Sequence, residues 1–436
     1  MIMKKIFNLI LSLAIASTTF SQETVYPAKD YKGMLFIKNG IVHVGNGQVM
    51  DRATIQVEDG KITKIGPDLP IPMDDVKVFD ASGKHVYPGL ILTNTNLGLV
   101  EINTVRASSD AREIGEYNPS VRSIVAYNTD SKLINPLKST GILLAHVAPE
   151  GAIISGSSSV VQLDAWNWED AAYKMDNGIY YNMPPLFNRP SRFGGFGGTQ
   201  QTTDPVKQGL EDIEKFKAFL KQARDYEKLG DKKEINLKFE SLKGLFTKQQ
   251  KLYINADIVK QILMCIDIRN ELGVDVVIVG GKESYQVANL LKANNIPVIL
   301  EALHDLPTLA DDDIHQPFKT PYILQQAGVL FAINDNYGNT RSRNLAYNAG
   351  TAVAYGLTKE QGLAAVTLNA AKILGIDNVT GSIEVGKDAN IVISTGDILD
   401  MRTNNITHAF IKGRSIELND KQKQLYERYK FKYNLN

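Results

Sequence analysis

Histidine and cysteine are scarce in this chain of 436 residues, which contains six histidines and one cysteine. A single cysteine cannot form an internal disulfide, so stability must come from a large core. Cys265 lies in ADIVKQILMCIDIRNELG, whose apolar residues repeat at helical spacing. We therefore expect Cys265 to be a small buried apolar side chain rather than a nucleophile.

Net charge is also absent, because 48 basic residues balance 48 acidic residues. This balance gives no general attraction to nucleic acid or to an anionic membrane. The apolar run from Ile6 to Ala16 is shorter than the roughly 20 residues that a spanning helix needs. It follows Lys4 and Lys5 and precedes small residues, which is typical of a signal peptide. We expect residues 1–21 to be removed and the protein to be exported, periplasmic or extracellular, with no membrane contact afterwards.

Two β-rich segments bracket the chain. Residues 33–87 contain short apolar runs punctuated by Asn39-Gly40 and Asp59-Gly60, which are strong hairpin signals. The same texture returns at 376–418 in GSIEVGKDANIVIS and ITHAFIKGRSIEL. We expect these segments to pair into one small composite β-domain, a β-sandwich built from the N- and C-terminal parts of the chain.

The middle, residues 88–375, alternates near-continuous apolar strands with helical patterns. Examples are VDVVIVGG, ESYQVANLLKANN, IPVILEAL and VLFAIND. Repeated βα units predict an α/β fold with a parallel sheet, and roughly eight candidate strands favour a TIM-like (β/α)8 barrel. A doubly wound open sheet is the alternative.

An insertion at about 184–250 interrupts this rhythm. RPSRFGGFGGTQQTTDP predicts a flexible glycine-rich stretch, and a charged helical pattern follows it. We interpret the insertion as a solvated segment, with a lid over the barrel mouth as the alternative. RFGGFGG neither follows a strand nor opens a helix, so it does not predict a phosphate-binding loop.

Four stretches resemble the amidohydrolase superfamily, most nearly its imidazolonepropionase-like branch. They are IKNGIVHVGNGQ, VEDGKITKIG, KHVYPGLI and TLNAAKILGIDNVTGSIEVGKDANIVI, where Asn390 stands at a position usually held by Asp. The resemblance spans about 33–418 apart from the insertion. It implies a hydrolase of C–N bonds in small molecules, with one or two divalent metals at the barrel mouth that activate a water molecule.

The metal ligands that this resemblance implies are replaced. The expected His-x-His of the first barrel strand matches Asn94 and Asn96 in LTNTNL, where alternation would place both side chains on one face. Asn255 and Gly280 stand at the histidine positions of the fifth and sixth strands. Amide oxygens are weak donors for zinc. Only Asp335 matches by position, as the eighth-strand Asp that would act as the general base.

The loop EALHDLPTLADDDIHQP gathers several other possible ligands after the seventh strand. His304, Asp305 and His315 could hold a relocated metal, or the loop could be a solvated, helix-capping acidic segment. His146 in GILLAHVAP could lie at the end of a strand, although a lone histidine is more often a hydrogen-bonded structural residue. We therefore predict a pocket that contains Asn94, Asn96, Asn255 and His304.

Two functional hypotheses follow. The first is an exported hydrolase that acts on a C–N bond of a small, cyclic amide-like substrate with a degenerate metal site. The second is a catalytically silent amidohydrolase-fold binding module, or the partner subunit of an active paralogue. Both expect a small-molecule ligand and allow a homo- or hetero-oligomer. The cofactor stays open, because the resemblance implies a divalent metal whose ligands are not present.

Overall fold

The computed structural model describes residues 25–435, except 74–75, 188–203, 230–233, 302, 309–310 and 337–340. The expected signal peptide and the RFGGFGG stretch therefore lie outside the described residues. Within the part that is described, no helix combines the length and the apolar character needed to cross a membrane.

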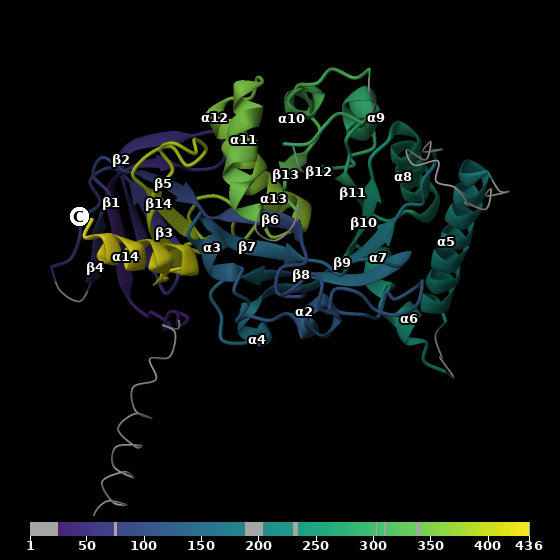
Figure 1. Cartoon of the computed structure of the whole chain (residues 1–436), viewed down its shortest axis with the longest axis horizontal. Helices are drawn as coiled ribbons and strands as arrows, with labels where there is room; N and C mark the ends of the chain where they lie inside the picture. Colours follow the sequence, from purple (N-terminus) through teal and green to yellow (C-terminus); the bar gives the residue numbers. More distant parts are fainter. Residues whose placement is uncertain are drawn as a thin grey trace, which may run out of the picture.

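The N- and C-terminal parts of the chain together form one mostly antiparallel sheet, here called the terminal sheet (Figure 1). The order β16-β15-β14-β5-β1-β2-β3, with β4 on β1, places the C-terminal β14 directly against the N-terminal β5. Its strands are β1 (Met34–His43), β2 (Val49–Glu58), β3 (Lys61–Gly66), β4 (Val76–Asp80), β5 (His85–Pro88), β14 (Ile391–Ser394), β15 (Ile406–Ile411) and β16 (Arg414–Ser415). The composite β-domain predicted from the sequence is confirmed, and it has a core of its own.

The two hairpin signals have different outcomes. Asp59 and Gly60 have φ angles of 48° and 82° and form the tight turn between β2 and β3, as predicted. The hairpin expected at Asn39-Gly40 is wrong, because β1 continues through both residues with a bulge. A Cβ atom at Gly40 would lie 2.6 Å from the Val86 side chain, so this glycine permits the close approach of β5.

The second sheet has eight strands in chain order and forms the TIM-like barrel. Its strands are β6 (Leu90–Thr95), β7 (Ile142–Val147), β8 (Ile154–Gln162), β9 (Ala172–Asn182), β10 (Lys251–Ala256), β11 (Val276–Gly280), β12 (Val298–Leu300) and β13 (Phe331–Ile333). All neighbours are parallel except β8, which runs antiparallel to β7 and β9. The connection from β7 to β8 is too short for a crossover helix, so one βα unit is replaced by a meander.

The first and last barrel strands meet through the side chain of Asn334. Asn334 Oδ1 accepts hydrogen bonds from the backbone N–H groups of Thr93, at 2.9 Å, and Asn94, at 3.3 Å. Asn334 Nδ2 donates to the carbonyl of Asn94 at 2.8 Å. A buried amide thus satisfies backbone groups of β6 where the strand ladder itself does not continue.

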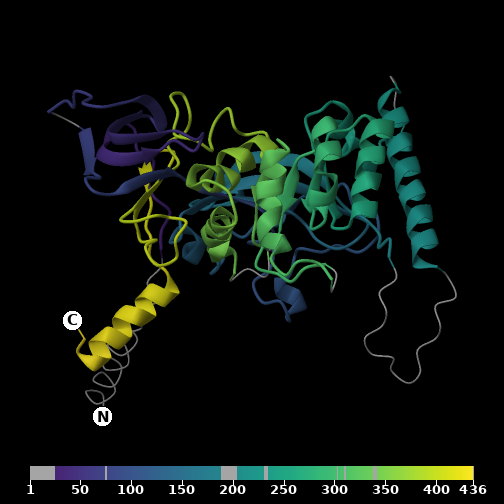
Figure 2. The ribbon, with the colours of Figure 1, turned by 90° about the horizontal axis from the view of Figure 1, so that it is seen from above.

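Helices cover the barrel (Figures 1 and 2). They are α2 (Ser123–Ala126), α3 (Ile134–Lys138), α4 (Trp168–Ala171), α5 (Pro205–Glu227), α6 (Leu237–Glu240), α7 (Lys243–Phe246), α8 (Val259–Leu272), α9 (Ala288–Ala293), α10 (Gln316–Gln326), α11 (Leu345–Ala354), α12 (Lys359–Ala365) and α13 (Leu368–Leu374), with 3-10 turns at η1 (Arg106–Ser108), η2 (Ser284–Val287) and η3 (Ser342–Asn344). A further helix, α14 (Lys421–Tyr433), lies at the terminal-sheet end of the molecule. The prediction of a TIM-like barrel is confirmed by this arrangement. Cys265 is buried in α8, as expected.

The described part of the insertion is packed rather than merely solvated. Phe216 of α5 is fully buried, and its ring stacks on Tyr181 of β9 at a centroid distance of 3.6 Å. Lys217 of α5 bonds to Asp267 and Glu271 of α8, each at 2.7 Å. The solvated interpretation is therefore wrong for α5, which covers the side of the barrel beside α8.

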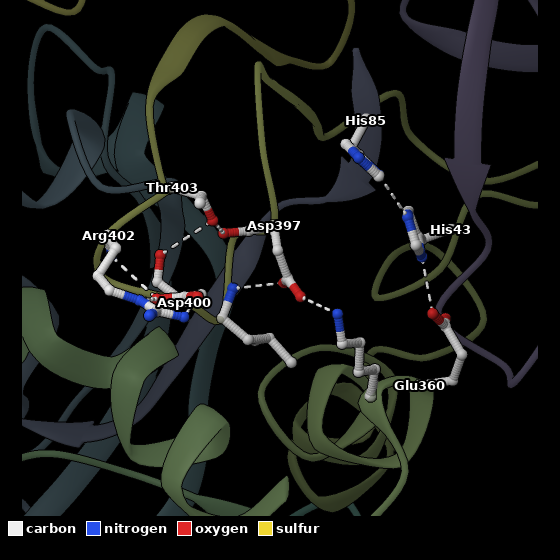
Figure 3. A network of polar contacts seen from close by, with 9 residues as sticks. His43, His85, Glu360, Asp397, Asp400, Arg402 and Thr403 are labelled. Carbon is white, nitrogen blue, oxygen red and sulfur yellow. Dashed lines mark hydrogen bonds and ion pairs between the residues drawn. The ribbon is translucent and has the colours of Figure 1, made fainter. Parts of the chain in front are cut away.

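A polar junction joins the terminal sheet to the barrel helices (Figure 3). His43 Nδ1 lies 2.7 Å from Glu360 Oε1 of α12, and His43 Nε2 lies 3.0 Å from His85 Nδ1. Tyr87 stacks on the His43 ring with 4.4 Å between centroids. His43 and His85 thus have structural partners, as expected for histidines in the β-rich segments.

Candidate active site

The C-terminal ends of the barrel strands meet around Glu301, which follows β12 directly. Asn94, the second-to-last residue of β6, donates a hydrogen bond from Nδ2 to Glu301 Oε1. Asn334 Nδ2 lies 3.4 Å from the same oxygen. Two amides from the first and last strands therefore orient one carboxyl group at the barrel mouth.

Glu301 is the functional candidate that the sequence interpretation missed. The pKa of Glu301 is raised to about 7, mainly by burial. The hydrogen bond from Asn94 opposes this rise, and the nearby carboxylate of Asp257 contributes to it. Near neutral pH this side chain is present in both protonation states. An acidic residue directly after a barrel strand was the available signal, because such positions carry catalytic groups in this fold.

A small pocket of about 30 Å³, partly open to solvent, adjoins Glu301. The loops after β11 and β12 line it with Lys282, Tyr285, Asp305 and Leu306. Lys282 Nζ and Asp305 Oδ2 are 2.8 Å apart, so the lysine charge is compensated inside the pocket. The pocket therefore has room for about one water molecule beside a carboxyl group that is able to exchange a proton.

Asn94 and Asn96 have different partners. β6 ends at Thr95, so Asn96 begins the following loop, and the strand alternation that would pair the two side chains no longer applies. Asn96 Nδ2 donates to Glu150 Oε1 at 2.8 Å, and Arg112 lies 3.7 Å from Glu150 Oε2. These groups line a second, open cavity rather than the pocket beside Glu301.

The two remaining replacement positions lie on neighbouring strands. Asn255 Nδ2 donates to Asn182 Oδ1 at 2.6 Å. Gly280 has a φ of 101°, and a Cβ atom there would lie 2.4 Å from Asp257 Oδ1. Asp257 thus occupies the space that a larger side chain at residue 280 would need.

Asp335 and His304 lie near one another but are held separately. Asp335 is buried and accepts a hydrogen bond from Asn348 Nδ2 at 2.9 Å. His304 Nε2 lies 2.7 Å from Thr351 Oγ1. Burial lowers the pKa of His304, and the charge of Asp335 partly opposes that shift.

The relocated metal site is not assembled in this structure. Asp305 bonds to Lys282, whereas His315 Nδ1 lies 3.0 Å from the Tyr355 hydroxyl. The rings of His304 and His315 both contact Phe318 rather than each other. Across the described ranges, no group of three or more His, Cys, Asp or Glu side chains is arranged to hold a metal ion.

His146 is a structural residue, as the simpler interpretation held. It is fully buried, with Nδ1 3.0 Å from the Thr93 carbonyl and Nε2 2.9 Å from Asn177 Oδ1. Burial lowers the pKa of His146 to about 4, so the ring is neutral at physiological pH. It supports the barrel interior below the mouth.

Comparisons with known proteins agree with this architecture. The chain superposes on the crystal structure of an amidohydrolase from Thermotoga maritima with a TM-score of 0.74 and 26% sequence identity, covering 88% of this chain and 99% of that one. The model of the amidohydrolase family matches residues 257–416, which include β11 to β16. The chain belongs to the amidohydrolase superfamily.

Curated relatives match this chain over shorter segments. The dihydroorotase of Mycobacterium tuberculosis is 28% identical over 168 residues, which cover 36% of this chain and 38% of that protein. The D-hydantoinase of Ralstonia pickettii is 38% identical over 77 residues, covering 18% of this chain and 16% of the relative. The chain thus matches well under half the length of these two proteins.

The metal that the superfamily implies does not fit the residues present. Three of the four implied histidine positions hold amides whose nitrogens are hydrogen-bonded to Glu301, Glu150 and Asn182. At the fourth position stands Gly280, where an added Cβ atom would collide with the side chain of Asp257. Neutral amide oxygens and a glycine do not provide the imidazole or carboxylate donors that zinc requires. The residues at these positions therefore do not form a zinc site of the kind that the superfamily implies.

Proposed function

We propose that this protein hydrolyses a C–N bond of a small, cyclic amide-like molecule at the barrel mouth. The observation that carries the proposal is Glu301, a carboxyl group held by Asn94 and Asn334 beside a small pocket, with a pKa raised to about 7 by burial. Relatives that bear the names dihydroorotase and D-hydantoinase support a hydrolase of this class.

Glu301 acts in two successive steps of this reaction. As a carboxylate, it takes a proton from a water molecule that adds to the amide carbonyl carbon. As the resulting carboxylic acid, it returns that proton to the leaving nitrogen when the C–N bond breaks. A pKa near 7 suits both roles at neutral pH, since a general acid–base catalyst works best near the operating pH. Ring opening gives one product that carries a carboxylic acid and an N–H group, and the acid then ionises and releases one proton to solvent.

The proposal is tested by measuring ring opening of hydantoin, dihydroorotate and related cyclic amides in a pH-stat. We expect Glu301→Gln to lower kcat by roughly 10²–10⁴-fold, the usual contribution of a positioned acid–base group. The matched control is Asp212→Asn, which removes a partly exposed acid from α5, on the side of the barrel, and should leave activity unchanged. Equal activity of Glu301→Gln and the parent chain would exclude the proposed role.

A second candidate function is favoured by the misfit at the metal positions. A catalytically silent amidohydrolase-fold protein would bind the same class of small molecule, alone or as the partner of an active paralogue. Calorimetric binding of a cyclic amide with no ring opening by either the parent chain or Glu301→Gln would support it. A stoichiometric transition metal, found by elemental mass spectrometry after gentle desalting, would contradict it.

The N-terminal sequence supports the proposal that the enzyme is exported and works in the periplasm or outside the cell. Mass spectrometry of the mature N-terminus in cell fractions tests this directly. A chain that is recovered intact in the cytoplasm would overturn it.

A further inference from the structure

The C-terminal helix α14 makes no buried contact with the rest of the described chain. It spans Lys421–Tyr433, and none of its residues is buried. Figure 2 shows it extending from the terminal-sheet end of the molecule, away from the barrel. Isolated helices of this length are marginally stable in water, because helix stability in proteins comes mainly from packing of one face. An unpacked helix of this kind calls for a surface that covers it.

The start of α14 is firmly attached. Asp420 is 5% exposed and caps the helix by accepting a hydrogen bond from the Lys423 N–H at 2.9 Å. The Leu418 carbonyl just before it accepts hydrogen bonds from Ser139 Oγ, at 3.2 Å, and from Lys423 Nζ, at 2.7 Å. The helix is therefore presented in a defined direction rather than as a loose tail.

One row of apolar and aromatic side chains follows one side of α14, whereas Phe431, which is 87% exposed, lies on the opposite side. Leu425, Tyr429 and Tyr433 are spaced four residues apart and so lie in one row, with Tyr426 in the adjacent row. Tyr429 and Tyr433 stack with 6.3 Å between ring centroids. Their side chains remain 52% and 60% exposed. This aromatic row is the part of the helix that gains most from leaving water.

Basic side chains flank the aromatic row. Arg428 and Lys432 form the next row on one side, and Lys430 follows Tyr426 on the other. The helix contains five basic residues, Lys421, Lys423, Arg428, Lys430 and Lys432, against one acidic residue, Glu427. The exposed helix α5, by contrast, has equal numbers of basic and acidic residues. The zero net charge of the whole chain therefore conceals a strongly cationic helix at one end.

We propose that α14 docks the protein on an anionic phospholipid surface. An aromatic row with lysines on both sides lies well in the plane of a lipid interface, where tyrosine rings occupy the headgroup level and lysine stems reach outward to phosphate. The apolar area is modest, so electrostatic attraction supplies much of the binding energy. Binding is reversible and weakens as salt rises. This goes beyond the hydrolase function and is independent of it.

The test is co-sedimentation of the full chain with vesicles of phosphatidylcholine, with and without phosphatidylglycerol. The apolar N-terminal segment is common to all variants, so each variant is compared with the parent chain. We expect the parent to bind vesicles that contain phosphatidylglycerol more tightly than pure phosphatidylcholine. Each lysine near an anionic surface contributes about a fivefold factor, so Lys430→Gln with Lys432→Gln should weaken binding roughly 30-fold.

Matched variants separate charge from aromatic contact and from other surfaces. Tyr429→Gln with Tyr433→Gln keeps the charge and should also weaken vesicle binding. Lys207→Gln with Lys215→Gln removes two exposed lysines from α5 and should leave binding unchanged. All six positions changed are unburied, and the thermal midpoint of each variant checks the fold.

Two results would overturn the proposal. One is equal binding of the parent chain to neutral and anionic vesicles, or equal binding of the α14 and α5 lysine variants. The other is a dimer in analytical ultracentrifugation that Tyr429→Gln with Tyr433→Gln converts to monomer, with no vesicle binding by the parent. The second result would assign the helix to a second copy of the chain.

Discussion

Replacing Asn334 by alanine tests whether one side chain closes the barrel. Asn334 is fully buried and bonds to three backbone groups of β6, the N–H groups of Thr93 and Asn94 and the carbonyl of Asn94. Asn334→Ala leaves all three groups without that partner. Each buried unsatisfied group costs about 1–3 kcal/mol, so we expect the three together to lower the free energy of unfolding by roughly 3–9 kcal/mol. That is a large share of the typical total of about 5–15 kcal/mol.

The assay is urea denaturation followed by circular dichroism and tryptophan fluorescence. The control is Asn405→Ala, which removes one exposed contact of 3.2 Å to Thr395 and should change stability by about 0.5 kcal/mol or less. Asn334→Asp adds a sharper comparison, because it keeps the acceptor but loses the donor and places a carboxyl beside Glu301. It should therefore be less stable above pH 7 than below it. A cost of under about 1 kcal/mol for Asn334→Ala would refute this account of barrel closure.

Three further predictions concern the site and the junction between the two sheets. The pKa of Glu301 is raised to about 7 from an ordinary 4.5, so between these pH values the folded state holds a proton that the unfolded state has released. This group therefore makes stability fall as pH rises from about 4.5 to 7. Glu301→Gln should flatten the decline in thermal midpoint between about pH 5 and 8, and parallel curves for the two proteins would contradict this. Gly280→His should neither bind zinc, by elemental mass spectrometry after dialysis, nor match the parent in thermal midpoint, because its Cβ meets Asp257 and its φ is positive. Glu360→Gln should lower the free energy of unfolding by about 1–2 kcal/mol in urea titration, since it weakens the 2.7 Å contact with His43, and an unchanged midpoint would mean that the junction adds no stability.

The sequence predicts the architecture well because its signals are local and repeated. Apolar strand runs between Gly89 and Asp335 correspond to eight barrel strands, and the β-rich ends form one sheet. The antiparallel β8 escaped prediction, because its nine residues, ISGSSSVVQ, are rich in serine and do not form an apolar run. Asn39-Gly40 misled for a related reason, since a positive φ at Asn39 serves a bulge as well as a hairpin.

The candidate site was only partly predictable, because its parts come from distant segments. The family resemblance drew attention to Asn94, Asn96 and Asn255, yet only Asn94 contacts Glu301. Asn334 and Glu301 are separated by 33 residues and from Asn94 by more than 200, so no local pattern joins them. The sequence shows which residues stand at these positions, but it does not show which contacts their side chains make.

The residues at two of the positions where the resemblance implies histidine, Asn94 and Gly280, both bear on the same carboxyl group, that of Glu301. With Gly280 in place of a larger side chain, Asp257 can occupy the vacated volume, and its charge then helps to keep Glu301 protonated near neutral pH. With an amide at residue 94, the same carboxyl gains a donor where an imidazole would have faced a metal. Gly280, through Asp257, and Asn94 thus both act on one buried carboxyl group, that of Glu301. Restoring a single histidine would therefore break a contact before it could rebuild a ligand set.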